Sequence, residues 1–261
     1  MDLHNKKVLI TGSSRGIGRA LTIKLVGEGC EVWGIARREK LLKNLKSEVN
    51  SPKNYLYSAI DISQKDSWDQ IVKSLRRKKY HPDIVIFNAA IFENDFINGL
   101  DFEKTRKMIE INYLSVIKGI QALFPLLKTN SQVIAISSSS ALKGSGEEGI
   151  GYAASKAALS IAFESLYLKY RNKIHFKTVF FGPVKTGMSP FSRHTILSLS
   201  EEDAVRAVIK SIERGDVISY YPLIIFYAYK LAKLLPSSYY FKFLTFIDEK
   251  IHQRLIVESD D

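Results

Sequence analysis

The N-terminal part of the chain reads Lys6-Lys7-Val8-Leu9-Ile10-Thr11-Gly12-Ser13-Ser14-Arg15-Gly16-Ile17-Gly18. The run up to Thr11 is rich in β-branched residues and predicts a strand, and residues 20–26 carry apolar side chains at helical spacing. A strand, a glycine turn and a helix in this order form a cradle for phosphate, because the helix N-terminus presents free amide groups to an anion. The glycines permit the tight turn, the approach of backbone to a pyrophosphate and close helix packing. Taken alone, the stretch could also be a structural turn without a ligand.

Strands and helices continue to alternate along the chain. Strands are expected at residues 31–36, 55–60, 83–87, 132–136 and 176–181, and helices at residues 63–79, 102–127, around Tyr152 and at 200–214, with Ser63 and Ser200 as N-caps. This alternation implies a parallel sheet with right-handed crossovers and with ligands at the C-terminal ends of its strands. We therefore expect a doubly wound α/β fold of about seven strands flanked by helices. No linker interrupts residues 1–261, so a single domain is expected, with residues 217–261 as its hydrophobic, helical C-terminal extension.

The composition limits the classes of protein to which this chain can belong. One cysteine, Cys30, excludes an internal disulfide framework and favours a reducing compartment, and the first ten residues lack a signal peptide, so we expect a cytoplasmic protein. The formal charge is +11, but the cations are dispersed or lie at helix ends, as at residues 37–46 and 76–79, so nucleic-acid binding is not expected. The positive charge instead favours binding of a phosphorylated cofactor or of anionic lipid. No metal site is predicted.

The end of the second strand bears on the cofactor. An aspartate or glutamate there would accept a hydrogen bond from the ribose 2′-hydroxyl of NAD, whereas this chain has Ala36-Arg37-Arg38. Arginine suits the 2′-phosphate of NADP, and Arg15 in the glycine turn could close on the same phosphate from the other side. Alternatively, Arg37 and Arg38 are a solvent-exposed pair at the start of the next helix, and this interpretation applies most to Arg38.

Other strand ends offer further contacts. Asp61 could accept from an adenine amino group with Ile62 beside the ring, and the small residues of Asn88-Ala89-Ala90 would let a cofactor lie flat on the backbone. Asn112 interrupts a helical pattern where a better helix former would cost nothing, so it is either functional or a buried, satisfied amide.

Two segments carry candidate acid–base chemistry. Ile136-Ser137-Ser138-Ser139-Ser140 ends an apolar strand, and Tyr152-Ala153-Ala154-Ser155-Lys156 places a phenol and an ammonium four residues apart, on one face of a helix. A neighbouring cation stabilises a phenolate, so the pair could transfer a proton to or from a substrate oxygen that a serine hydroxyl holds. A chance occurrence of this spacing is the alternative for the pair taken alone.

Together these motifs resemble the short-chain dehydrogenase/reductase family of NAD(P)-dependent oxidoreductases, over roughly residues 5–215. The resemblance implies a Rossmann-type sheet. It implies that Tyr152 is the general acid/base and that Lys156 lowers the pKa of this tyrosine and binds the nicotinamide ribose. It also implies that Ser138 positions the substrate oxygen and that Asn112 supports a water leading to the lysine. The implied cofactor-binding residues are Gly12, Ser14, Arg15, Gly16, Ile17, Gly18, Arg37, Arg38, Asp61, Ile62, Asn88, Ala89, Ala90, Tyr152, Lys156, Pro183, Val184 and Thr186.

Three positions depart from the family pattern. Ala90 replaces the usual glycine, and Phe181 replaces the proline before Gly182, although Pro183 could restore stiffness. The catalytic serine is Ser138 when counted from the strand end and Ser139 when counted back from Tyr152. We favour Ser138, because the intervening loop can absorb an insertion.

Residues 217–247 are apolar, aromatic and basic. Spanning a bilayer takes ~20 apolar residues, and lysines interrupt this segment before that length. It could lie in a membrane interface, wall a pocket for a long-chain substrate, or pack on the enzyme or in a dimer. The family resemblance also implies a homodimer or homotetramer formed through the helices near residues 102–127 and 151–170, where Ile161, Leu166 and Leu168 could face a partner or the sheet.

The leading functional hypothesis is an NADP(H)-dependent carbonyl reductase, or the reverse alcohol dehydrogenase, acting on an apolar and lipid-like small molecule. The alternative is a non-catalytic NADP-binding protein that gates a partner or membrane contact.

Overall fold

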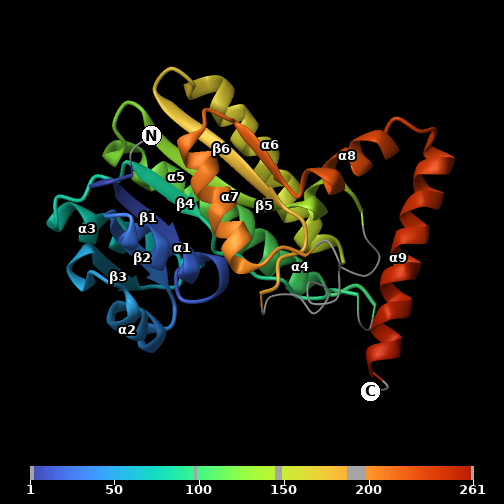
Figure 1. Ribbon diagram of the computed structural model, residues 1–261, viewed down its shortest axis with the longest axis horizontal. Coiled ribbons are helices and arrows are strands. Elements are labelled where there is room, and N and C mark those ends of the chain that lie inside the picture. The colour runs from blue at the N-terminus through green and yellow to red at the C-terminus, as the bar shows by residue number, and fades with distance from the viewer. Residues whose placement is uncertain (1–2, 97–98, 145–148, 187–197, 260–261) are drawn as a thin grey trace.

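A computed structural model describes residues 3–96, 99–144, 149–186 and 198–259. Seven parallel strands form one sheet in the order β3-β2-β1-β4-β5-β6-β7. The strands are β1 (Lys7–Thr11), β2 (Glu31–Ala36), β3 (Tyr55–Ala59), β4 (Ile84–Phe87), β5 (Ser131–Ser138), β6 (Ile174–Phe181) and β7 (Ile218–Tyr221). Figure 1 shows helices on both faces of the sheet, so the predicted doubly wound α/β fold is confirmed.

Helices cover the sheet in two layers because successive side chains of a strand point to opposite faces. Val8 and Ile10 of β1 join one apolar cluster, whereas Leu9 joins the other. The first cluster contains buried residues of α1 and α7, and the second contains buried residues of α3, α5 and α6. The helices are α1 (Gly16–Gly27), α2 (Glu39–Glu48), α3 (Ser67–Arg77), α4 (Phe102–Ile109), α5 (Ser115–Leu123), α6 (Ile150–Tyr170), α7 (Glu201–Glu213), α8 (Leu223–Ala232) and α9 (Ser237–Ser259).

The strand order reverses between β1 and β4. The chain moves outward from β1 to β2 and β3 on one side and from β4 to β7 on the other. Helices leave the two adjacent strands on opposite faces there, which opens a crevice at their C-terminal ends. Gly12 and Asn88 directly follow these two strands, so the topology brings their loops to this crevice.

Two predicted helix starts have different outcomes. Ser200 is the N-cap of α7 and forms a capping box with Asp203, as expected. Ser63 is not a cap, because α3 begins only at Ser67, and the prediction was wrong there. The backbone amide and hydroxyl of Ser63 instead donate to Oδ1 of Asp61, over 3.0 and 2.8 Å. The carboxylate thus holds Ser63 in a turn.

The C-terminal part differs from the sequence prediction at its start. Residues Ile218–Tyr221 form β7, the edge strand beside β6, whereas a helical extension was expected from residue 217 onward. The extension proper consists of α8 and α9, which Figure 1 shows at the right-hand margin of the molecule, with α9 in red. Neither α8 nor α9, nor any other helix within the described residues, is both long and apolar enough to cross a membrane.

Candidate active site

The glycine turn after β1 is locked against the loop after β4. Nδ2 of Asn88 donates to the carbonyl oxygens of Thr11 and Gly12, over 3.1 and 3.3 Å, and Oγ1 of Thr11 accepts from the amides of Asn88 and Ala89. Glycine is required where the segments meet. A Cβ on Gly12 would lie 2.8 Å from Cα of Ala89, and one on Gly18 would lie 2.3 Å from the Gly12 oxygen. The turn therefore leaves backbone facing the crevice at the start of α1.

Asn112 fastens the loop after β4 to the helix that carries Tyr152. It lies in a π-helical turn (Glu110–Leu114) between α4 and α5 and is fully buried. Its Oδ1 accepts from the amide of Ile91 over 2.8 Å, while its Nδ2 donates to the Ile91 oxygen over 2.9 Å and to Oγ of Ser155 over 3.1 Å. A π-turn inside a helix commonly marks a functional position, and here it points an amide between two elements of the site.

Tyr152 and Lys156 lie one turn apart near the start of α6. Lys156 is only 3% exposed, and its Nζ donates to the carbonyl oxygen of Ile136 over 2.8 Å and lies 5.9 Å from the centre of the Tyr152 ring. Burial disfavours the ammonium and lowers the pKa of Lys156 from 10.5 to about 8. The lysine therefore remains mainly cationic at neutral pH, beside the phenol.

A buried carboxylate that sequence reasoning missed anchors the start of this helix. Gly149, the residue before α6, offers no capping side chain. Asp95, from the loop after β4, takes that place and accepts from the amides of Ile150 and Gly151 over 3.0 and 2.9 Å. Its Oδ2 also accepts from the hydroxyl of Thr105 on α4 over 2.6 Å. No local pattern signals such a cap, because 55 residues separate Asp95 from Ile150.

The serine run at the end of β5 divides into different environments. Ser137 lines the cavity, and its hydroxyl lies 2.9 Å from Oγ of Ser160 on α6. Ser138 caps the short 3₁₀ turn Ser139–Leu142 by accepting from the amide of Ser140 over 3.2 Å. Ser138 and Ser139 both line the cavity, so the choice between them as the substrate-facing hydroxyl stays a prediction.

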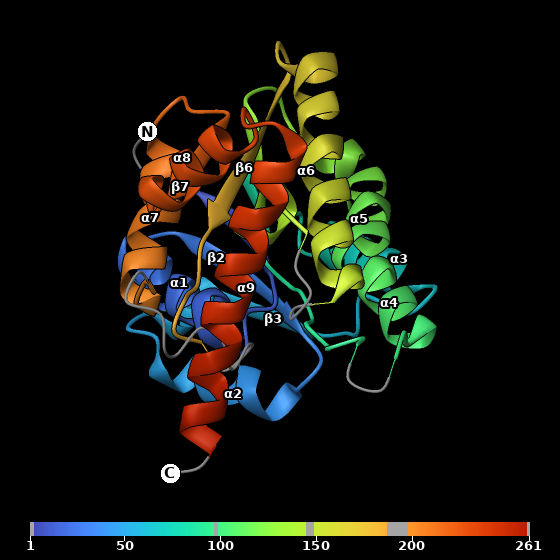
Figure 2. The same cartoon turned by 90° about the vertical axis from the view of Figure 1, so that its right-hand side faces the viewer.

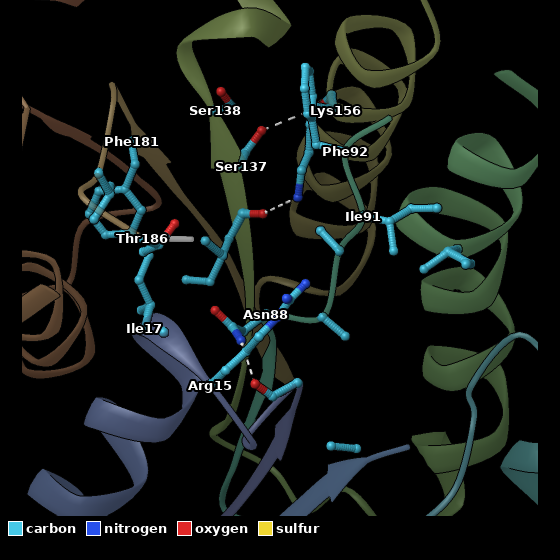
Figure 3. A pocket seen from close by; sticks show the side chains of 18 of the residues that line it. Arg15, Ile17, Asn88, Ile91, Phe92, Ser137, Ser138, Lys156, Phe181 and Thr186 are labelled. Atoms are coloured by element: carbon cyan, nitrogen blue, oxygen red, sulfur yellow. Dashed lines mark hydrogen bonds between the residues drawn. The ribbon is translucent and has the colours of Figure 1, made fainter. Parts of the chain in front are cut away.

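These segments enclose a cavity of about 430 Å³ at the C-terminal ends of the strands. Figure 3 shows Arg15 and Asn88 at one end of it and Phe92 and Lys156 at the other. Of the predicted site residues, all except Gly18 and Asn112 line this cavity: Gly12, Ser14, Arg15, Gly16, Ile17, Arg37, Arg38, Asp61, Ile62, Asn88, Ala89, Ala90, Ser138, Tyr152, Lys156, Pro183, Val184 and Thr186. Gly18 packs closely on Gly12 and Asn88 of the cavity lining. Asn112 bonds to Ile91, which lines the cavity, and to Ser155.

Two further features of the lining were not predicted. Phe92 packs edge-to-face on Tyr152, with ring centres 5.4 Å apart, and lines the cavity with Ile91, Ile111 and Phe181. At the other end the exposed guanidinium of Arg37 lies 3.8 Å from the carboxylate of Asp61. The cavity therefore has a cationic end near the glycine turn and an apolar end near Tyr152.

Comparison with known proteins agrees with this geometry. The family model for short chain dehydrogenases matches residues 6–196. The chain is 33% identical to an NADPH-dependent pterin aldehyde reductase of Arabidopsis thaliana over 62% of this chain and 66% of that protein. It is 28% identical to a benzil reductase ((S)-benzoin forming) of Saccharomyces cerevisiae over 73% of this chain and 76% of that protein.

Solved structures share the fold. A short chain dehydrogenase from Burkholderia cenocepacia in complex with NADP superposes with a TM-score of 0.75 at 22% identity, covering 88% of this chain and 93% of that one. A short-chain dehydrogenase/reductase from Serratia marcescens superposes with a TM-score of 0.76 at 22% identity, covering 84% and 97%. Because the family model covers well over half of the sequence, the chain belongs to the short-chain dehydrogenase/reductase family of oxidoreductases.

Proposed function

We propose that this protein is an NADP(H)-dependent oxidoreductase that interconverts a carbonyl and an alcohol on an apolar small molecule. The observation that carries the proposal is the placement of Tyr152 and the buried Lys156 in the same cavity as the glycine turn and three arginines. One end of the cavity can therefore hold a phosphorylated dinucleotide while the other presents a phenol to a substrate oxygen.

The residues at the glycine turn fit a dinucleotide. Gly12 and Gly16 have φ angles of +74° and +52°, and the turn has no side chain where backbone must approach a pyrophosphate. Arg15, Arg37 and Arg38 line the same end and supply positive charge for a ribose 2′-phosphate, for which Ala36 leaves room. Asp61 and Ile62 would contact the adenine. NADP is therefore the cofactor that these residues favour, and when bound it supplies or accepts the hydride.

In the reaction, the protein's own side chains transfer one proton. Tyr152 gives its phenolic proton to the substrate oxygen during reduction and takes it back during oxidation. Lys156 supports both directions, because a cation 5.9 Å from the ring stabilises the phenolate. The Ser138 hydroxyl, or that of Ser139, holds the substrate oxygen. Asn112 keeps α6 and the loop at Ile91 in register, so that the phenol keeps its position.

The lining beside Tyr152 supports an apolar substrate. Phe92, Ile111 and Phe181 face this end of the cavity and offer a substrate no charge. Behind them, α8 packs against Gly182, where a Cβ would lie 2.7 Å from Cδ1 of Ile225. The C-terminal segment thus supports the wall of the substrate end. Two relatives are named as reductases of a pterin aldehyde and of benzil, which is consistent with reduction of a carbonyl compound.

We also propose that the enzyme is a homodimer or homotetramer through α4, α5 and α6. Ile161 and Leu168 on α6 are 62% and 64% exposed, whereas Leu166 packs toward the core. Burying these apolar side chains against a second copy would remove them from water.

The test has two independent readouts. NADPH binding measured by calorimetry tests the cofactor site, and NADPH consumption with a panel of aldehydes and ketones tests the reaction. We expect micromolar binding of NADPH, and turnover that favours apolar carbonyl compounds. Failure to bind NADPH or NADH would refute the cofactor assignment. Binding without turnover on any compound would favour the non-catalytic alternative.

A further inference from the structure

Helix α8 is apolar on both of its faces. Its inner face packs on the sheet: the ring of Phe226 lies 4.5 Å from that of Tyr220 and 5.9 Å from that of Phe180. Its outer face presents Leu223, Ile224, Tyr227 and Leu231 to solvent, with Ile224 63% and Leu231 65% exposed. The positions i, i+4 and i+8 of Leu223, Tyr227 and Leu231 form one stripe along the helix. A folded protein rarely leaves so continuous an apolar face in water without a partner.

The exposed apolar surface continues beyond α8. Leu234 and Leu235 follow the helix, and α9 exposes Tyr239, Phe241 and Phe246. We call these residues, together with the outer face of α8, the C-terminal apolar surface. Aromatic side chains beside aliphatic ones are characteristic of segments that lie at the boundary between lipid headgroups and acyl chains.

The charged side chains between residues 217 and 247 are all cationic, and the nearest carboxylates in the sequence are Asp216 and Asp248. Residues 217–247 contain three lysines, Lys230, Lys233 and Lys242, and no aspartate or glutamate. All three lysines are exposed. Lysines with long apolar stems can lie beside buried aliphatic groups while their ammonium groups reach headgroup phosphates. This arrangement complements an anionic lipid surface.

The same charges disfavour a second copy as the partner. A two-fold symmetric contact places a surface against itself. The C-terminal apolar surface would then bring lysines from both copies together without a carboxylate from residues 217–247 to pair with them. Lipid therefore fits the charge of this surface better than the same surface of another protomer does.

The surface lies next to the site. α8 contacts the 3₁₀ turn Ser139–Leu142, and Nζ of Lys143 lies 5.9 Å from the ring of Tyr229. Figure 1 shows β6 pointing toward α8, with α9 beyond it, and in Figure 2 α9 runs across the side of the molecule that this strand end faces. A surface bound there would lie on the side of the molecule where the cavity is located.

We propose that the C-terminal apolar surface binds an anionic lipid membrane peripherally, with the outer face of α8 in the headgroup boundary. This contact goes beyond the proposed reaction and does not require turnover. It would give an apolar substrate a short path from the lipid phase to the cavity.

Cosedimentation of the full chain with vesicles tests the contact. Vesicles of phosphatidylcholine with phosphatidylglycerol should bind the protein at low salt, and vesicles of pure phosphatidylcholine should bind it more weakly. High salt should weaken binding to the anionic vesicles, because it screens the lysines. The double substitution Ile224→Ser with Leu231→Ser should weaken it by about tenfold or more, because two apolar side chains no longer enter the boundary.

Matched variants keep the test specific. Ile161→Ser with Leu168→Ser removes two residues of α6 that are as exposed in one protomer and belong to the proposed contact between copies. This variant should still bind anionic vesicles, even where light scattering shows a lower mass. Lys233→Glu with Lys242→Glu should abolish the preference for anionic vesicles, whereas Lys73→Glu with Lys169→Glu, on α3 and α6, should retain it. Circular dichroism confirms that each variant is folded.

Two results would overturn the proposal. One is absence of cosedimentation with anionic vesicles at low salt. The other is a double substitution at Ile224 and Leu231 that leaves vesicle binding unchanged but lowers the mass in light scattering without lipid, which would assign this face to a second copy.

Discussion

Asp95 accepts a hydrogen bond from the backbone amide of Gly151 over 2.9 Å, and so fixes the first turn of the helix in which Tyr152 is the next residue. The same carboxylate accepts from Ile150 and from Thr105, so it joins the loop after β4, α4 and α6 at one point. An anion at a helix N-terminus is stabilised by the free amides and by the helix dipole. The position of Tyr152 thus depends on a residue distant in sequence.

Asp95→Ala should lower both stability and turnover. Removing the carboxylate leaves the buried amide of Gly151 and the partly buried amide of Ile150 without their acceptor, which costs about 1–3 kcal/mol. Because the phenol loses its anchor, kcat should fall while NADPH affinity stays within a few-fold. Asp101→Ala is the matched control, since Asp101 caps α4 by accepting from Lys104 and does not line the cavity. That variant should lose about 1 kcal/mol of stability and keep kcat. Equal kcat values for the two variants would contradict the positioning role of Asp95.

The buried Lys156 predicts a pH dependence of stability. Its pKa is about 8 when folded and near 10.5 when unfolded, so between these values the unfolded chain binds more protons. The free energy of unfolding should therefore rise with pH across this window, by on the order of 3 kcal/mol in total. Lys156→Met lacks this contribution. Urea unfolding of both proteins without cofactor, from about pH 7 to pH 10, should show their difference changing by most of this amount, and parallel curves would rule out the lowered pKa.

Gly18→Ala and Gly27→Ala compare two positions in the same helix. A Cβ on Gly18 would lie 2.3 Å from the oxygen of Gly12 and 2.5 Å from Nδ2 of Asn88, whereas a Cβ on Gly27 meets nothing within 4 Å. Gly18→Ala should therefore destabilise the protein and weaken NADPH binding, because the glycine turn must shift. Gly27→Ala should stabilise it by about 0.4–1 kcal/mol. Unfolding curves and cofactor titrations check both, and unimpaired NADPH binding by Gly18→Ala would show that the turn does not cradle the cofactor.

Much of the fold could be predicted because parallel strands buried on both faces are continuous apolar runs, as in Ile84–Phe87. β7 was harder to recognise, since Ile218–Tyr221 merges with the apolar residues of α8 and only Pro222 separates them. Ser63 is not the predicted cap because it forms a turn with Asp61, and α3 begins only at Ser67. Contacts between distant residues, such as those of Asp95, leave no local pattern. That residues 1–261 unfold as one domain stays a prediction, which a single calorimetric transition would support.

Arg37→Asp should shift the cofactor preference toward NADH. Arg37 lines the cationic end of the cavity near Asp61, and a charge-assisted bond to a 2′-phosphate is worth about 1.5–3 kcal/mol. Its loss should lower kcat/KM for NADPH by about 10–100-fold and leave kcat/KM for NADH within a few-fold. Arg106→Asp, on the exposed side of α4 and outside the cavity, should change neither value. Equal use of both cofactors by the unmodified protein would refute the assignment of Arg37.

Single-turnover reduction by the Tyr152→Phe variant tests most directly whether Tyr152 supplies the proton. The substitution keeps the ring that packs on Phe92 and removes only the phenolic hydroxyl. NADPH affinity, measured by calorimetry, should stay within a few-fold of that of the unmodified protein. The rate of NADPH oxidation with the best carbonyl substrate should fall by about 10²–10⁴-fold. Tight NADPH binding with an unchanged rate would show that another group transfers the proton and would contradict the proposed mechanism.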